Sequence, residues 1–341
     1  MTTHEREITA PVDLCTSEGE LNPAALGWSR VPLHRANLSG HPGRNKRWDY
    51  WAVLAGDLVV SSVYANIDVV GLADVWWADL STGVSGGTGV ATEEAAAFAL
   101  PERPGTDPLR IDRDGFRLDI VDDDEGTRLT ASWVERDGRP GHLDVRVELP
   151  VGHESLNVVI PWDGPLFNYT SKHQARPAAG ALRVGDQQYE IGGAAGGAWG
   201  VLDVGRGRWP AQLAWNWGGG AGRVGSHVVG LQFGAKWTEG SGFTENGLLV
   251  DGRLHKIGRE LELSYDWDAP LEPWRIVDPD GQIDVTLHPR FAKHSALPGP
   301  NGGSETHQVF GTFSGSVRTD DGTELTFDAL QGFVEEARQD W

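Results

Sequence analysis

The chain has 341 residues, of which 39% are hydrophobic and 23% charged, and this ordinary globular composition excludes intrinsic disorder. Its formal net charge is −20, with 49 acidic against 29 basic residues, which excludes phosphate backbones and anionic membrane surfaces as favourable partners. The single cysteine excludes a disulfide framework, and the sequence has neither an apolar N-terminal core nor a run of roughly 18 apolar residues. We therefore expect no membrane insertion and a cytoplasmic location, and from the charge we expect no nucleic acid partner.

Alternation of apolar and polar residues, which is typical of half-buried strands, dominates the chain. Strand-like sequence runs from about Trp48 to Trp162. Near its end, Leu143, Val145, Val147 and Leu149 alternate with charged residues. Because successive side chains of a strand point to opposite faces, these four predict one apolar face of a sheet.

Helix is scarce in the rest of the pattern. A Thr-Glu-Glu start followed by alanines predicts one short helix over residues 92–99, and a short turn is expected after Gly332. Glycine-rich sequence fills residues 180–225, and a second series of strands begins near Arg259 and continues to the C-terminus.

Asp-Gly pairs flanked by strand-like sequence predict tight hairpin turns, because this dipeptide readily adopts positive φ angles. Five such pairs occur, at residues 114–115, 137–138, 251–252, 280–281 and 321–322. Many short antiparallel strands joined by hairpins indicate an all-β protein built of barrels or sandwiches. The length exceeds the roughly 250–300 residues at which a single core stops growing, which favours two domains.

The most informative segment for function covers residues 209–220, which contain Trp209, Trp215 and Trp217 and end in three glycines. In a strand, Trp215 and Trp217 point to one face and Asn216 points to the other. Two indoles side by side on the inner face of a barrel would line a flat apolar cavity, and the glycines would leave space beside the rings. The alternative is a pair of tryptophans that simply fill a core.

A second segment, residues 161–173, places several chemically capable side chains in one irregular stretch. Asp163 offers a carboxylate, Asn168 an amide, Tyr169 a phenol, Lys172 an ammonium and His173 an imidazole. His173 could exchange protons near neutral pH, and Asp163 could act as a general acid. The alternative for His173 is a hydrogen-bonded structural role or a place at the surface.

Two further candidates lie elsewhere in the chain. Glu245 precedes an apolar run and, if it points into a barrel, its pKa would be raised and it could donate protons. Its alternative is a structural bond to a backbone amide. Trp51 belongs to a cluster of aromatic residues at 48–51 that adds apolar surface. The predicted catalytic residues are thus Glu245, Asp163 and His173, and the predicted ligand-binding residues are Trp215, Asn216, Trp217, Tyr169, Asn168, Trp209 and Trp51.

Motifs for cofactors are missing from the sequence. No phosphate-binding loop, dinucleotide fingerprint, zinc-protease motif, paired-cysteine motif or nucleophile elbow occurs, and eleven histidines are spread without metal-ligand spacing. We therefore expect no cofactor and no metal.

Seven short segments together resemble a bacterial family of uncharacterised proteins related to the hydroxyneurosporene synthase (carotenoid 1,2-hydratase) superfamily of two-domain lipocalin-like proteins. The similar segments are residues 45–51, 209–218, 244–246, 250–256, 272–276, 310–315 and 332–335. The resemblance implies two lipocalin-like antiparallel β-barrel or sandwich domains, residues 1–258 and 259–341, with a pocket between or within them. It further implies apolar substrates and chemistry without a cofactor.

The sequence departs from the hydratases at one telling position. The hydratases carry a histidine directly before the residue similar to Asn216, whereas this chain has Trp215 there. An indole cannot shuttle protons, so the resemblance does not by itself carry hydration over to this chain.

Three functions fit these observations. The first is a cofactor-independent hydro-lyase or isomerase acting on an isoprenoid-like or polyketide-like molecule, with Glu245 or Asp163 protonating an alkene and Trp215 and Trp217 facing the resulting cation. The second is a lipocalin-type carrier or sensor of a hydrophobic ligand without chemistry. The third is a glycan-processing protein, which ranks last because no carboxylate pair can be placed at the required separation. Nothing in the sequence fixes the oligomeric state.

Overall fold

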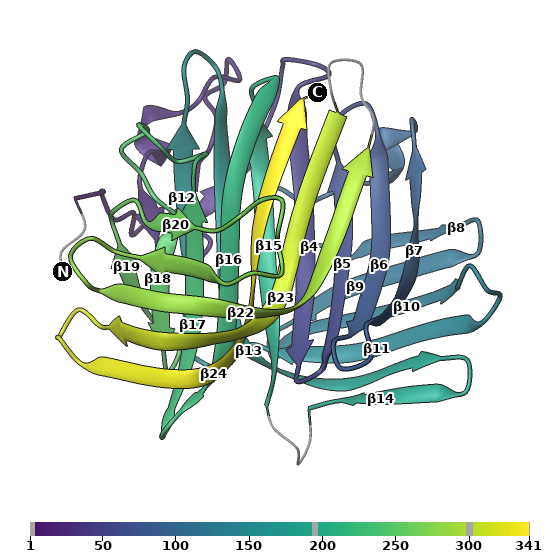
Figure 1. Cartoon of the computed structure of the whole chain (residues 1–341). Coiled ribbons are helices and arrows are strands. Elements are labelled where there is room, and N and C mark those ends of the chain that lie inside the picture. Colours follow the sequence, from purple (N-terminus) through teal and green to yellow (C-terminus); the bar gives the residue numbers. More distant parts are fainter. Residues whose placement is uncertain (1–3, 193–196, 298–302, 341) are drawn as a thin grey trace.

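The computed structural model describes residues 4–192, 197–297 and 303–340, and its regular structure is almost entirely β (Figure 1). The helical structure in these ranges is two 3-10 turns, η1 (Pro23–Ala25) and η2 (Ala95–Ala97). Neither turn is long or apolar enough to cross a bilayer. The all-β prediction is therefore confirmed.

The first of two large sheets forms a nearly closed barrel. Ten of its 13 strands follow one another in the order β7-β6-β5-β4-β15-β13-β11-β10-β9-β8, and β2, β12 and β14 attach through β13 and β12. These strands are β2 (Trp28–Ser29), β4 (Asn45–Ala55), β5 (Leu58–Asn66), β6 (Gly71–Asp79), β7 (Val84–Thr92), β8 (Leu109–Arg113), β9 (Phe116–Asp123), β10 (Gly126–Val134), β11 (Pro140–Glu148), β12 (Leu156–Pro161), β13 (Phe167–Val184), β14 (Gln187–Ile191) and β15 (Ala198–Arg208). A separate pair, β1 (Val12–Asp13) and β3 (His34–Arg35), lies in the N-terminal segment.

One carboxylate links β6 and β7, at one end of this sheet, to β10 near the other end. Glu135, just after β10, accepts the indole N–H groups of Trp77 on β6 and Trp133 on β10, at 2.7 and 3.0 Å. It also accepts the backbone N–H of Gly87 on β7 at 3.0 Å. The interior of the barrel is a packed apolar core, so it leaves little room for a ligand.

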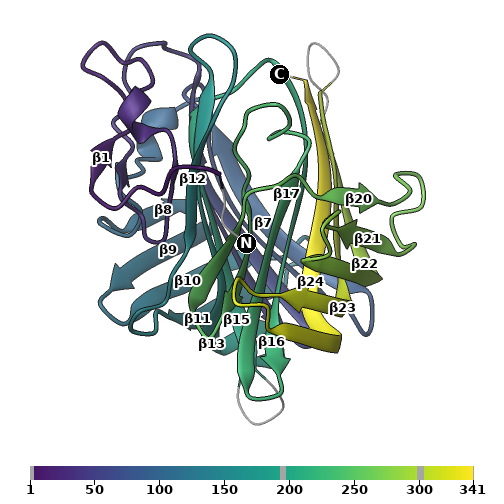
Figure 2. The ribbon, with the colours of Figure 1, turned by 90° about the vertical axis from the view of Figure 1, so that its left-hand side faces the viewer.

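The second sheet is an open half-barrel of nine antiparallel strands in the order β19-β18-β17-β16-β24-β23-β22-β21-β20. The strands are β16 (Gln212–Val224), β17 (His227–Ala235), β18 (Asn246–Val250), β19 (Arg253–Ile257), β20 (Glu262–Ser264), β21 (Trp274–Val277), β22 (Ile283–Leu297), β23 (Gly303–Arg318) and β24 (Glu324–Asp340). Figures 1 and 2 show β22, β23 and β24 lying across the outer face of β4, β5 and β6.

The two sheets meet in an apolar layer. Ala52 and Val201 of the first sheet pack in one cluster with Trp217, Phe310 and Phe333 of the second sheet. The outer face of the barrel is therefore a buried surface where the second sheet covers it, and a cavity that opens in this layer is walled by both sheets.

The change from the first sheet to the second falls at residues 209–211, between β15 and β16. Gly258, near which the sequence places the boundary, follows β19, and β16–β19 belong to the second sheet because β16 pairs with β24. We propose residues 209–211 as the domain boundary.

The sequence predictions for single segments were confirmed in part. Leu143, Val145 and Val147 are buried on one face of β11 as predicted, but Leu149 lies beyond the strand and is 39% exposed. The helix predicted over residues 92–99 was wrong, since only one 3-10 turn forms there. The turn expected after Gly332 was also wrong, because that segment continues β24.

Candidate functional site

The floor of the candidate site is the outer face of three adjacent strands, β4, β15 and β13. Their register places three rows of residues side by side: Lys46, Gly207 and Asn168; Trp48, Gly205 and Thr170; and Tyr50, Asp203 and Lys172. A side chain at Gly205 would overlap the indole of Trp48. Glycine at this position therefore lets the Trp48 ring lie flat across the sheet.

A cavity of about 260 Å³ stands on this floor, and the second sheet and the connecting segments wall it. Trp215 and Trp217 contribute from β16, and Trp209 contributes from the link between the sheets. The ring of Trp209 meets those of Trp48 and Trp215 edge to face, with centroids 5.0 and 5.3 Å apart. These contacts form an aromatic lining of the kind that receives flat apolar molecules.

Three carboxylates face this apolar cavity, and each accepts a hydrogen bond from an indole N–H. The bonds are Trp237 Nε1 to Glu245 Oε1 at 2.8 Å, Trp215 Nε1 to Glu335 Oε1 at 2.8 Å and Trp48 Nε1 to Asp203 Oδ2 at 3.4 Å. The indoles therefore both line the cavity and orient its acids.

Lys172 is the cation at the centre of the site. Its Nζ lies 2.9 Å from Asp203 Oδ1 and 3.1 Å from Glu245 Oε2, and it stands 4.6 Å from the centroid of the Trp217 ring. Burial favours the neutral amine, but the two carboxylates outweigh it and raise the pKa of Lys172. Lys172 is therefore charged at neutral pH.

Glu245 and Glu335 are the carboxyl groups of the cavity whose pKa values lie near neutral pH. Burial raises the pKa of Glu245 to about 7, with Lys172 opposing the rise. Burial likewise raises the pKa of Glu335 to about 7 against the hydrogen bond from Trp215. Glu245 is 1% exposed, and a side chain at Gly234 would collide with its carboxyl group, so Gly234 makes the room that Glu245 occupies.

Two buried polar atoms of the cavity have neither a hydrogen bond nor an ion pair among the described residues. They are Oδ1 of Asn168 and Nε1 of Trp209. Glu245 Oε2 also has no hydrogen bond, but it is paired with Lys172. Asn168 pairs with Gly207, two residues before Trp209, so both belong to the same end of the cavity. Lys46 belongs to this end too, with its Nζ 5.8 Å from the centroid of the Trp209 ring, and burial lowers its pKa to about 7.

The structure brings five of the residues predicted from sequence into this cavity: Glu245, Asn168, Trp209, Trp215 and Trp217. The cavity lies between the sheets, whereas the tryptophans were expected on the inner face of a barrel. The reason is that β16 belongs to the second sheet and turns its indoles toward the outer face of the first.

Three predicted ligand-binding residues lie outside the cavity because of strand alternation. Asn216 points away from Trp215 and Trp217, and its Nδ2 donates to Tyr265 Oη at 3.0 Å. Trp51 points into the barrel core, 2% exposed. Tyr169 packs in the cluster beneath the N-terminal segment, and its hydroxyl donates to Asn157 at 3.3 Å.

Two predicted catalytic residues also lie outside the cavity. His173 is buried beside Ser171, with its Nε2 2.9 Å from Ser171 Oγ, and burial holds its pKa well below the ordinary value. This matches the structural alternative for His173. Asp163 lies exposed in the turn between β12 and β13, away from the cavity lining.

Sequence reasoning did not single out Lys172, Asp203, Glu335 or Trp237 as site residues. Alternation from Asn168 to Lys172 could have indicated Lys172, since both residues share a face of β13. No local signal marks Asp203, whose place opposite Lys172 follows from the pairing of β15 with β13.

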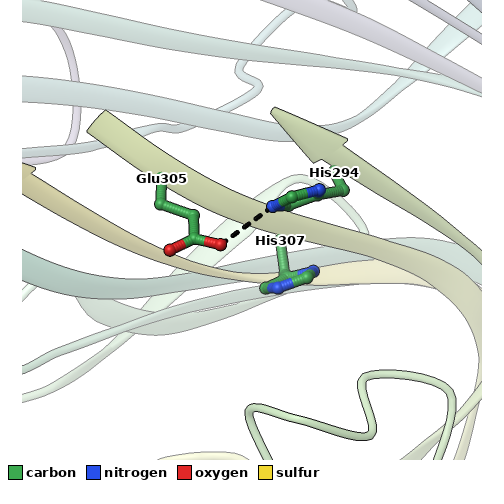
Figure 3. A group of neighbouring side chains, drawn as sticks. All are labelled: His294, Glu305 and His307. Atoms are coloured by element: carbon green, nitrogen blue, oxygen red, sulfur yellow. Dashed lines mark hydrogen bonds and ion pairs between the residues drawn. The ribbon is translucent and has the colours of Figure 1, made fainter. Parts of the chain in front are cut away.

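A second group of chemically capable side chains lies on β22 and β23, outside the cavity (Figure 3). One ligand atom from each of His294, Glu305 and His307 lies within 4.8 Å of the other two, so the group could hold a metal ion. The sequence suggested no metal because the spacing along the chain is unremarkable. The residues meet because β22 pairs with β23.

Comparison with known proteins defines the family and supports the fold. The family model described as a domain of unknown function, DUF2804, matches residues 5–341. No curated protein matches the chain. A solved structure of an AttH protein from Nitrosomonas europaea is similar with a TM-score of 0.51 and 12% identity, over 86% of this chain and 92% of that chain. This likeness supports the lipocalin-like architecture implied by the sequence resemblance.

Two other solved structures are more distant. CghA in complex with Sch210972 has a TM-score of 0.46 at 12% identity, over 87% of this chain and 89% of that chain. Kievitone hydratase from Nectria haematococca has a TM-score of 0.46 at 12% identity, over 87% of this chain and 90% of that chain.

Proposed function

The chain belongs to the DUF2804 family, and we propose that its cavity binds a small, largely apolar molecule carrying a hydroxyl or similar group and performs cofactor-independent proton transfer on it at Glu245. The observation that carries this proposal is a buried carboxyl, with a pKa of about 7, inside a tryptophan-lined cavity.

The lining supports the apolar character of the ligand. Five tryptophans face a volume of about 260 Å³, close to the lower end of the roughly 300–1,000 Å³ range of small-molecule pockets. Burying a flat apolar ligand against these rings removes apolar surface from water, at roughly 25 cal/mol per Å². The net charge of −20 favours a neutral or cationic ligand over an anionic one.

The unpaired polar atoms support a hydroxyl on the ligand. A buried polar atom without a partner costs about 1–3 kcal/mol. A ligand hydroxyl at this end of the cavity carries the donor that Asn168 Oδ1 lacks and the acceptor that Trp209 Nε1 lacks. A hydrocarbon without polar groups would leave both costs in place.

The chemistry follows from the protonation states of the site. At neutral pH Glu245 is present both as an acid and as a carboxylate, so it can give a proton to an alkene carbon and later take one from the oxygen that adds. Lys172 remains charged and stabilises the carboxylate left after donation. A positioned proton transfer of this kind contributes typically 10²–10⁴-fold in rate. Hydration, isomerisation and cyclisation of an alkene all begin with such a step.

Lys172 changes where a developing positive charge is best accommodated. Its ammonium already stands against the face of Trp217, so a carbocation there would be repelled. The ring of Trp215, whose N–H is bonded to Glu335, is the better face for such a charge and could contribute about 0.5–2 kcal/mol of cation–π stabilisation.

A carrier or sensor without chemistry is the second candidate. The observation that favours it is that the cavity acids are already held by indole N–H groups and by Lys172, which is a stable resting arrangement. Trp215 also occupies the position at which the similar hydratases carry a histidine, and an indole cannot shuttle protons.

One experiment separates the two candidates. The protein is purified without added ligand, the molecule that copurifies is identified by untargeted mass spectrometry, and it is then incubated with wild-type protein and with Glu245→Gln. We expect both proteins to bind it and only the wild type to convert it, with at least a 100-fold loss of rate in the variant. Glu260→Gln is the control, because burial also raises the pKa of Glu260, which is half-buried and lies outside the cavity.

Equal conversion by wild type and Glu245→Gln would overturn the catalytic assignment. A ligand recovered unaltered after prolonged incubation with the wild type would establish the carrier instead.

A further inference from the structure

We propose that His294, Glu305 and His307 form a zinc-binding site on the ribbon of β22 and β23, separate from the cavity. All three side chains stand on the same face of this two-stranded ribbon (Figure 3).

Strand register brings the three ligands together. His294 lies directly opposite His307, and Glu305 precedes His307 by two residues and so shares its face. Directly opposed residues of antiparallel strands have Cβ atoms about 4.5–5.5 Å apart, a separation at which two imidazoles can reach one ion. The ring centroids of His294 and His307 lie 4.6 Å apart, and the two ring planes are inclined by 16°. His294 Nε2 lies 3.0 Å from Glu305 Oε1.

The ligand set identifies the class of ion. Two imidazoles and one carboxylate match the ligands that zinc takes in proteins, at about 2.0–2.2 Å each. Magnesium and calcium prefer oxygen ligands throughout, so the two histidines disfavour them. Ligand atoms around a tetrahedral zinc lie roughly 3.3 Å apart, so the group closes on the ion by small side-chain rotations from its spread of at most 4.8 Å. Water would take the fourth position.

The surroundings of the group hold His307 in place and leave His294 and Glu305 open to solvent. The ring of His307 meets Trp267 edge to face at 4.3 Å, and the Arg338 guanidinium stacks on Trp267 at 3.7 Å. Nδ1 of His307 has no hydrogen-bond partner among the described residues. The side chains of His294 and Glu305 are 50% and 46% exposed, so an ion can reach them from solvent.

A zinc ion bound by these residues would cross-link β22 and β23. The unfolded chain does not hold His294 opposite His307, so an ion that binds the folded protein preferentially raises its thermal stability.

The test uses the full chain, freed of metal by a chelator and titrated with zinc chloride in a calorimeter. We expect one zinc ion per chain, and at least a 10-fold loss of affinity in each of His294→Gln and His307→Gln. Glu305→Gln should weaken binding less, because the amide oxygen still coordinates. His288→Gln is the matched control, since His288 is also an exposed histidine of β22 but bonds to Ser314 at 2.8 Å.

A second measurement uses the wild type alone, so it tests the proposal even where a variant does not fold. X-ray absorption of the zinc-loaded wild type should show two imidazole nitrogens and oxygen ligands. Absence of saturable binding by the wild type, or an unchanged affinity in His294→Gln and His307→Gln, would overturn the proposal.

Discussion

Replacing Glu335 by glutamine tests whether the cavity is a low-dielectric environment, the premise on which proton transfer at neutral pH depends. Glutamine has nearly the same shape as glutamate, and its side-chain oxygen can still accept the Trp215 N–H. Burial raises the pKa of Glu335 from an ordinary 4.5 to about 7. Glu335 is 9% exposed, so solvent screens it little.

The sign and size of the effect follow from proton linkage. The folded state holds the Glu335 proton more tightly than the unfolded state, so this residue makes the protein lose stability as the pH rises from 4.5 to 7. Each pH unit in that interval costs about 1.4 kcal/mol, which gives about 3 kcal/mol in all. Below pH 4.5 both states are protonated and the cost is absent.

The assay is urea unfolding of the wild type and of Glu335→Gln at pH 4.5 and at pH 8. We expect the free energy of unfolding of the variant, relative to the wild type, to increase by about 3 kcal/mol between these two pH values. The substitution would then have a more favourable effect on the free energy of unfolding at pH 8 than at pH 4.5. Parallel pH profiles for the two proteins would refute the reasoning, because they would show that Glu335 titrates as if exposed to water.

Two further predictions concern the cation and the unpaired end of the cavity. Lys172→Met leaves Asp203 and Glu245 buried without their shared cation, so the free energy of unfolding at pH 8 should fall by about 3–5 kcal/mol. At pH 5 the fall should be smaller, because Glu245 is protonated there. An equal loss at both pH values in urea titrations would contradict the ion-pair arrangement. Trp209→Phe removes only the indole N–H and part of the ring, so a hydroxylated ligand should bind about 10-fold more weakly, as measured by calorimetry, while its analogue without the hydroxyl should bind about equally well to both proteins. A similar loss for both ligands would show that Trp209 acts through packing and not through its hydrogen bond to the ligand beside Asn168.

Which sequence predictions succeeded depends on how local their physical basis is. The period of two along β11 and β16 is set by the geometry of a single strand, so it predicted the all-β class and the shared face of Trp215 and Trp217 correctly. The helix expected over residues 92–99 failed because one short run of alanines does not offset the cost of helix nucleation, and Asn66 of β5 bonds the carbonyls of Ala95 and Phe98 instead.

The sequence by itself determined that strands would dominate, that Trp215 and Trp217 would share one face of a strand and that the family resemblance would extend over nearly the whole chain. Only the tertiary structure decided that the cavity lies between two sheets, that Lys172 stands opposite Asp203 and that His294 stands opposite His307. The physical reason is that alternation fixes the face on which a side chain lies, whereas the choice of partner strand and the register depend on pairing between segments distant in sequence, which no local pattern encodes.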